Sequence, residues 1–122
     1  MSDQPIVVWA EIPVTDLEKS VKFYNAVFSY DLKIDTSGPN PMAMLGDGVS
    51  GTGAHLYPGK PATNGNGATT HIAVPDTLEA TMQRCKSAGG TVLSEPIEIP
   101  PGRFAYALDL DGNSIGLFET KG

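Results

Sequence analysis

Residues 11–19 read EIPVTDLEK, and a degenerate copy, IAVPDTLEA, returns at residues 72–80. Each copy contains an alternating apolar run, a break at proline and aspartate, and then the start of a periodic helix with leucine on its inner face. One strand-helix unit is therefore used twice along the chain, and the fold follows from the residues around each copy.

The residues around the first copy predict a module of one helix and four strands. Apolar side chains alternate from Ile6 to Val14, which indicates a strand. Thr15 and Glu18 have the spacing of a capping box, so we expect a helix over residues 16–28. Three short strands separated by turn-rich pieces then follow, at residues 30–34, 42–45 and 53–57.

The second half repeats this order after a connector at residues 58–68 that is rich in glycine, proline and asparagine. A strand at 69–74 leads into a helix whose apolar stripe includes Cys85 and which ends before Gly89. Residues 111–113, DGN, have the composition of a hairpin turn and lack the other ligands of a calcium loop. The three remaining strands are expected at residues 91–97, 104–108 and 114–119.

These patterns predict an α+β fold of two paired βαβββ modules in a single domain, with module one at about 5–57 and module two at about 69–120. A chain of 122 residues, 40% of them hydrophobic, is long enough for one real core. We expect the sheets to form a half-open surface around a cleft, with the helices outside. Strand alternation places Trp9 and Glu11 on one inner face and His71 on the other.

The composition limits the classes of binding partner and the cellular compartment that we expect. Fourteen acidic residues against eight basic ones give a formal net charge of −6, which disfavours a nucleic acid or an anionic membrane as partner. No apolar run approaches the roughly 20 residues that a membrane-spanning helix requires. The first five residues, MSDQP, lack the parts of a secretion signal, and the single cysteine cannot form an internal disulfide. We therefore expect a cytoplasmic protein with a small-molecule ligand.

Four motifs carry a resemblance to a known family. They are EIPVTDL at 11–17, FY at 23–24, AGG at 88–90 and DGNSIGL at 111–117. In this order and spacing, the chain over residues 5–120 resembles the vicinal oxygen chelate superfamily, which includes glyoxalase I, bleomycin-resistance proteins and extradiol dioxygenases. The resemblance implies paired βαβββ modules and a homodimer, and the exposed sheet edges expected here also favour a homodimer.

The resemblance also implies where a metal would bind. Catalytic members hold a divalent metal with four side chains, one from the first and one from the last strand of each module. Three of these positions fall on Trp9, Thr69 and Gly116, which have lost the ligand chemistry, and the other lies around His55. No metal cofactor is therefore favoured. The alternative is an offset site for Zn, Ni, Mn or Fe with these ligands: Glu11, His55 and His71.

We expect a metal-independent protein that binds a small cationic or planar aromatic ligand, because the chain is acidic and aromatic side chains are expected along the cleft. Whether it catalyses a reaction is left open. The alternatives are a metal-dependent lyase, isomerase or dioxygenase of the superfamily, and a non-catalytic interaction module with a filled cleft. Some candidates also have structural interpretations, such as packing for Trp9 and a surface charge for Arg103. The expected ligand-contacting residues are Trp9, Glu11, His55, His71, Arg103, Tyr106 and Phe118.

Overall fold

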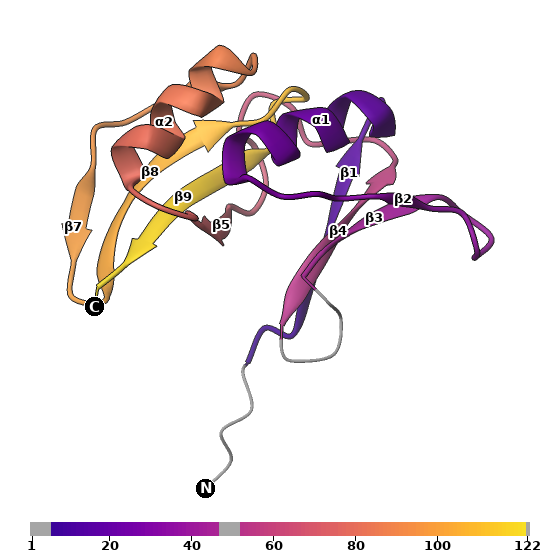
Figure 1. Ribbon diagram of the computed structural model, residues 1–122, viewed down its shortest axis with the longest axis horizontal. Helices are drawn as coiled ribbons and strands as arrows, with labels where there is room; N and C mark the ends of the chain where they lie inside the picture. Colours follow the sequence, from indigo (N-terminus) through magenta and orange to yellow (C-terminus); the bar gives the residue numbers. More distant parts are fainter. Residues whose placement is uncertain (1–5, 47–51, 122) are drawn as a thin grey trace, which may run out of the picture.

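The computed structural model describes residues 6–46 and 52–121, which form two sheets with two helices on one side of them (Figure 1). Residues 1–5, on which the secretion-signal expectation rests, and residues 47–51 inside module one lie outside the described part of the chain. The mixed architecture with two separate sheets confirms the predicted α+β class. Neither helix in the described ranges is long and apolar enough to cross a membrane.

Sheet A belongs to module one. It contains β1 (Trp9–Val14), β2 (Ile34–Asp35), β3 (Met42–Leu45) and β4 (Gly53–Pro58) in the order β1-β4-β3-β2. β1 runs parallel to β4, and the other pairs are antiparallel. Helix α1 (Leu17–Phe28) covers one face of this sheet and leaves the other face open.

Sheet B belongs to module two and repeats this arrangement with one more strand. Its elements in chain order are β5 (Thr70–Ala73), α2 (Leu78–Ser87), β6 (Thr91–Val92), β7 (Ile97–Ile99), β8 (Gly102–Leu108) and β9 (Ser114–Thr120). The strand order is β5-β9-β8-β6, and β7 also pairs with β8. β5 is parallel to β9, as β1 is to β4, so the two modules share one topology.

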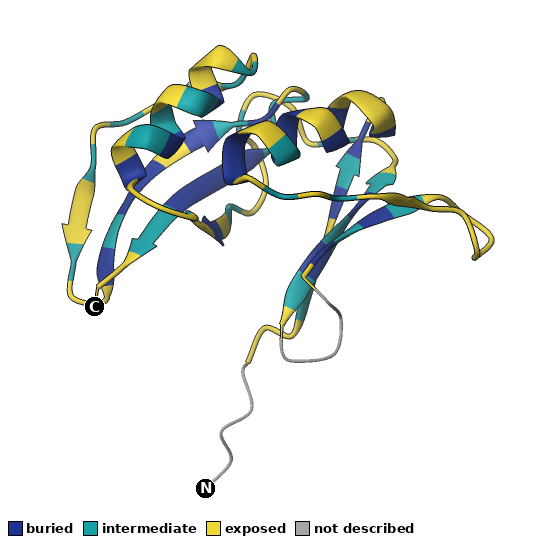
Figure 2. Cartoon of the chain, viewed as in Figure 1, coloured by how far each residue is buried: buried dark blue, intermediate teal, exposed yellow. Residues whose placement is uncertain are grey.

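One hydrophobic core lies between the helices and the sheets, because α1 and α2 contact each other above both sheets. Val14, Leu56 and Leu117 are fully buried members of this core. Figure 2 shows buried segments on the strands beneath the helices. Cys85 lies on the buried stripe of α2, and burial raises the pKa of its thiol to about 11. The prediction that Cys85 lies on the apolar, core-facing stripe of the second helix is therefore confirmed.

The strand predicted at residues 30–34 is wrong, because regular pairing begins only at Ile34 in β2. Helix α1 ends at Ser29 in the left-handed conformation, with φ of 59°. The side-chain oxygen of Asn25 then accepts the backbone N–H of Leu32 at 2.8 Å. This side-chain bond replaces the strand pairing that an edge strand would need.

The single strand predicted at residues 91–97 is divided into β6 and β7. The hydroxyl of Ser94 accepts the backbone N–H of Tyr106 at 3.0 Å, in the place where a strand would offer a backbone carbonyl. Pro96, which follows shortly, has no N–H to donate. The pairing with β8 is therefore interrupted between Leu93 and Ile97.

The N-cap of α1 also differs from the predicted capping box. Asp16, not Thr15, is the cap, and its side chain accepts the backbone N–H of Lys19 at 3.1 Å. The hydroxyl of Thr15 donates instead to the carboxylate of Asp111, in the turn between β8 and β9. The first copy of the repeated unit therefore contacts the end of the second module.

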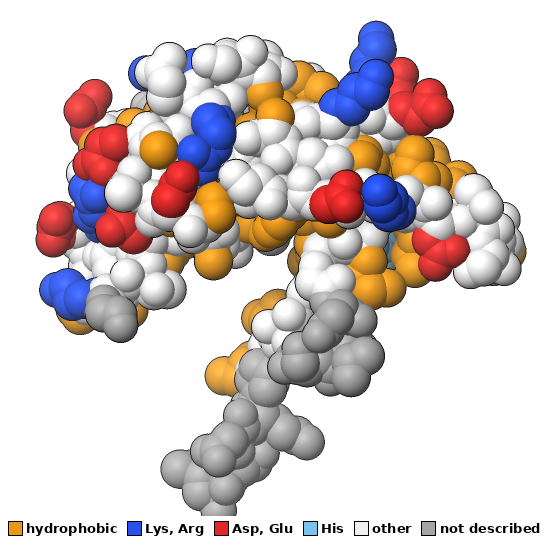
Figure 3. Space-filling view, in the orientation of Figure 1, with side chains coloured by type: hydrophobic (Ala, Val, Ile, Leu, Met, Phe, Trp, Pro, Cys, Tyr) orange, Lys and Arg blue, Asp and Glu red, His pale blue; other side chains and the backbone are white. Residues whose placement is uncertain are grey.

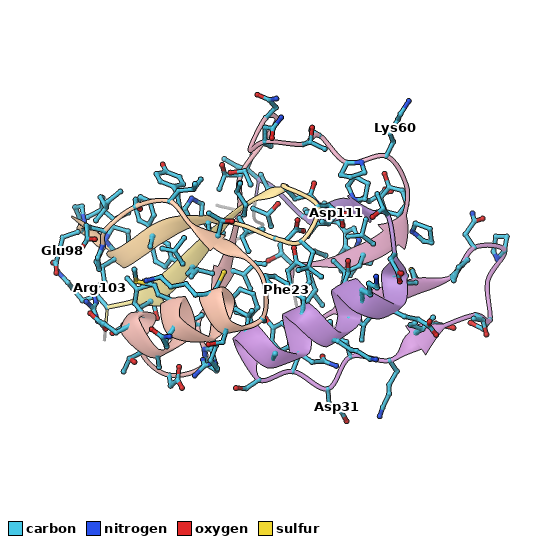
Figure 4. All side chains as sticks on the ribbon, turned by 90° about the horizontal axis from the view of Figure 1, so that it is seen from above. Phe23, Asp31, Lys60, Glu98, Arg103 and Asp111 are labelled. Atoms are coloured by element: carbon cyan, nitrogen blue, oxygen red, sulfur yellow. The ribbon has the colours of Figure 1, made fainter. Side chains whose placement is uncertain are left out.

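A buried polar network around Asp109 fixes this contact between the modules. Its carboxylate accepts the Tyr24 hydroxyl at 2.7 Å and the backbone N–H groups of Asp111 and Asn113 at 2.9 and 3.0 Å. The side-chain amide of Asn113 donates to the carbonyl oxygen of Pro13 at 2.8 Å. Figure 4 shows Asp111 where the two modules meet. The predicted hairpin turn is confirmed, and it also holds β1 in place.

Candidate functional site

The inner face of sheet A, which points away from the helices, carries an acid, an imidazole and an indole side by side. Glu11 on β1 lies directly across from His55 on β4. The indole Nε1–H of Trp9 donates to Nδ1 of His55 at 2.9 Å. On the other side of the ring, His55 Nε2 lies 3.8 Å from the Glu11 carboxylate. Strand alternation thus placed Trp9 and Glu11 correctly on one face, and the structure brings both to His55.

A cavity of about 610 Å³ opens on this face, and we call it the acidic cavity. The hairpin that joins β2 to β3 forms one wall, and β1 and β4 form the floor. Its volume is in the range of small-molecule sites. The lining residues are Glu11, Asp35, Ser37, Gly38, Pro39, Asn40, Pro41, Met42, His55, Tyr57 and Pro58.

The charged side chains among the described lining residues of the acidic cavity are acidic. Glu11 and Asp35 line it, and no lysine or arginine is among its lining residues in the described chain. The hydroxyl and the backbone N–H of Ser37 donate to the Asp35 carboxylate at 2.6 and 2.9 Å, and these bonds lower the pKa of Asp35. Asp35 therefore keeps its negative charge at neutral pH. A cation would be attracted to this cavity and an anion repelled.

The inner face of sheet B is aromatic. The His71 ring on β5 meets Phe104 and Phe118 edge to face, with ring centroids 5.0 and 5.8 Å apart, and lies 6.1 Å from the Tyr106 ring. Burial lowers the pKa of His71, which favours its neutral form. Three of the predicted site residues, His71, Tyr106 and Phe118, thus gather on one surface. Figure 3 shows hydrophobic side chains on the concave underside between the sheets.

The predicted residues do not all meet in one cavity. Glu11 and His55 line the acidic cavity, whereas Trp9 and His71 line a second cavity of about 700 Å³ between β1 and β5. The two repeated strands therefore face each other across this gap, as the duplicated pattern indicates. Of the expected ligand-contacting residues, only Glu11 and His55 line the acidic cavity.

Arg103 lies on the opposite face of sheet B, against α2 (Figure 4). Its guanidinium donates to the carboxylate of Glu79 at 2.6 Å and to that of Glu119 at 3.0 Å. These two carboxylates raise the pKa of Arg103, so its charge is permanent and already paired. We therefore remove Arg103 from the candidate site.

The side chains present do not fit the four-ligand metal site that the resemblance implies. In the described residues, no group of three or more His, Cys, Asp or Glu side chains converges to hold a metal ion, so Glu11, His55 and His71 do not form the offset site within one chain. Gly116 lies across from His71, and a Cβ at that position would overlap the His71 imidazole. The space for a fourth ligand is thus filled by His71, and Trp9 occupies the place of the first.

The sequence patterns did not predict several residues that line the acidic cavity. Tyr57 lies two residues after His55 on β4, so strand alternation puts both rings on the inner face, 5.9 Å apart. Asp35 and the prolines of the following turn had no motif to mark them. Their contribution depends on how the hairpin at residues 36–41 folds over the sheet, which no local pattern specifies.

The duplicated βαβββ topology, with helices on one side and open inner sheet faces on the other, defines a fold of paired modules. A model of the Glyoxalase/Bleomycin resistance protein/Dioxygenase superfamily matches residues 6–117, and the chain belongs to this superfamily. The family resemblance of the four sequence motifs is thereby confirmed.

Individual relatives agree with this assignment. A probable lactoylglutathione lyase from Vibrio cholerae is 35% identical over 118 residues, which cover 88% of this chain and 86% of the relative. A glyoxalase/bleomycin resistance protein from Albidiferax ferrireducens matches with a TM-score of 0.75 at 25% identity, over 96% of this chain and 100% of its own. TnmS3, an antibiotic binding protein from a Streptomyces species, has a TM-score of 0.67 at 26% identity, over 99% and 100% of the two chains.

Proposed function

We propose that this chain is a metal-independent member of the superfamily that binds a small cationic or planar aromatic ligand in the acidic cavity. The observation that carries the proposal is a cavity of about 610 Å³ that two carboxylates line without a lysine or arginine among its lining residues in the described chain. The rings of His55 and Tyr57 offer flat surfaces for stacking and for cation–π contact. An open cavity also argues against an interaction module whose cleft is filled by its own side chains.

The binding proposal predicts that a flat cationic dye changes the fluorescence of Trp9, the only tryptophan, because Trp9 contacts His55 at the cavity floor. Glu11→Gln removes one of the two negative charges and should weaken binding about threefold to fivefold, the range for an exposed charge pair. Glu98→Gln, an equal charge change on exposed β7, should leave the affinity unchanged. Equal weakening by both variants, or no fluorescence change with any cationic or planar compound, contradicts the proposal.

A metal-dependent lyase is the second candidate function, because the relatives from two Vibrio species that are 35% and 32% identical carry the name probable lactoylglutathione lyase. Metal analysis of untagged protein separates the two candidates. We expect less than about a tenth of an equivalent of Zn, Ni, Mn or Fe per chain after incubation with each ion, since the ligands do not converge. One tightly held ion per chain would favour the lyase, isomerase or dioxygenase alternative.

We also propose that the protein is a cytoplasmic homodimer that does not bind nucleic acid. The aromatic inner face of sheet B and the exposed apolar side chains of Ile6, Val7 and Val8, which are 99%, 72% and 61% exposed, favour burial against a second copy. The net charge of −6 disfavours a phosphate backbone. Sedimentation equilibrium should give twice the mass of one chain, and a monomer at micromolar concentration contradicts this proposal.

A further inference from the structure

Trp9 decides which nitrogen of His55 carries the proton. The indole N–H is only a donor, so the Nδ1 atom that receives it at 2.9 Å must present its lone pair. The proton of the neutral ring is then on Nε2, which points away from Trp9 and toward Glu11. The indole thus makes the exposed edge of His55 a hydrogen-bond donor.

The structure holds this contact in place from two sides. The Trp9 ring lies over Gly53 of β4, where a Cβ would come within 2.5 Å of the Leu45 carbonyl oxygen and within 3.2 Å of the indole, so the bare Gly53 backbone leaves room for both. The edge of Tyr57 packs against the other side of the imidazole, with centroids 5.9 Å apart. The His55 side chain is only 18% exposed, which further limits its rotation.

Beside the His55 donor lies an acceptor. The Nε2 atom and a Glu11 carboxylate oxygen are 3.8 Å apart, which is too long for a hydrogen bond between them. Both residues line the acidic cavity. The cavity floor therefore offers one donor and one acceptor side by side, with room for a ligand group that bonds to both.

We propose that this pair recognises the edge of a primary carboxamide or a lactam on a planar ligand, and that Trp9 is the positioning residue that makes this recognition possible. The ligand carbonyl oxygen accepts from His55 Nε2–H, and the adjacent ligand N–H donates to Glu11. A carboxylate in the same place would face Glu11 and Asp35 and be repelled. The inference deepens the proposed function and rests on it, because it assigns the ligand class of the same cavity.

The tautomer is tested without any ligand. Long-range proton–nitrogen spectra of the imidazoles, recorded at about pH 8, are simple because the chain has two histidines. His71→Asn assigns the remaining signals to His55. We expect His55 to carry its proton on Nε2 in the native protein and a mixture of tautomers in Trp9→Phe, which keeps an aromatic ring without the N–H. A proton on Nδ1 in the native protein, or identical spectra for both proteins, overturns the inference.

The ligand class is tested with three probes of similar size: benzamide, acetophenone, which lacks the N–H donor, and benzylamine, which is cationic. Benzamide should bind at least about fivefold more tightly than acetophenone, the value of one hydrogen bond. Trp9→Phe and Glu11→Ala should both reduce this preference, and Glu98→Ala should not. If benzylamine binds but benzamide has no advantage over acetophenone, the amide inference fails alone. If neither benzylamine nor benzamide binds, the proposed function fails with it.

Discussion

Replacing Asp109 by alanine is expected to lower the free energy of unfolding by about 3 kcal/mol. The Asp109 side chain is buried, at 5% exposure, and accepts four hydrogen bonds within the β8–β9 turn and from Tyr24. Alanine leaves the fully buried Tyr24 hydroxyl without its acceptor. Burial and the neighbouring Asp109 charge raise the pKa of Tyr24 well above its ordinary value, so the phenol stays a donor that needs a partner.

Urea unfolding followed by circular dichroism measures this loss. Tyr24→Phe removes one donor and leaves Asp109 its other three bonds, so it should cost only about 1 kcal/mol. Asp31→Ala is the matched control, because that carboxylate is 87% exposed and pairs with the exposed Lys33, and its effect should stay within about 0.5 kcal/mol. A loss in Asp109→Ala no larger than in Asp31→Ala would show that the network does not hold the modules together.

The Asp109 network is a part of the fold that the sequence patterns did not predict. The repeated EIPVTDLEK pattern indicates the two modules, and the DGN turn is recognisable from its composition. Neither pattern indicates that the turn of module two binds Pro13 and Thr15 of module one. That contact joins residues almost 100 positions apart, and local propensity carries no information about it. For the same reason two side-chain bonds were missed: that of Asn25, which replaces strand pairing before Ile34, and that of Ser94, which interrupts the strand predicted at residues 91–97.

For a related reason, the sequence patterns predicted the strand faces of the candidate site but not its cavities. Strand alternation places Trp9, Glu11 and His71 on inner faces, and the structure confirms this arrangement. Alternation does not say which cavity each inner face lines, so it could not separate His71 from the acidic cavity. Glycine is the residue type in the sequence that could have indicated where the large rings lie. Gly53 and Gly116 each lie across a parallel strand pair from a large ring. The His71 ring fills the space of a side chain at Gly116, and the Trp9 ring packs tightly over Gly53.

Gly116→Ala is therefore expected to destabilise the protein by about 1 kcal/mol, at the low end of the cost of overfilling a packed position, because the exposed His71 side chain can turn away. A methyl group there would overlap the His71 imidazole and come within 2.7 Å of its Cγ. The ring would have to turn out of its edge-to-face contacts with Phe104 and Phe118. Urea unfolding of the single variants and of the double variant measures the coupling between the two positions.

In the His71→Ala background the same Gly116→Ala change should cost less than about 0.5 kcal/mol, because the overlapping ring is gone. Gly38→Ala is the control, since a Cβ at that exposed turn meets nothing within 4 Å. An equal cost of Gly116→Ala with and without His71 would show that the ring does not fill this space. A glutamate at position 116 would put its Cβ in the place of this methyl group. A fourth metal ligand at that position and the present orientation of His71 are thus mutually exclusive, so restoring such a ligand requires His71 to leave its contacts with Phe104 and Phe118.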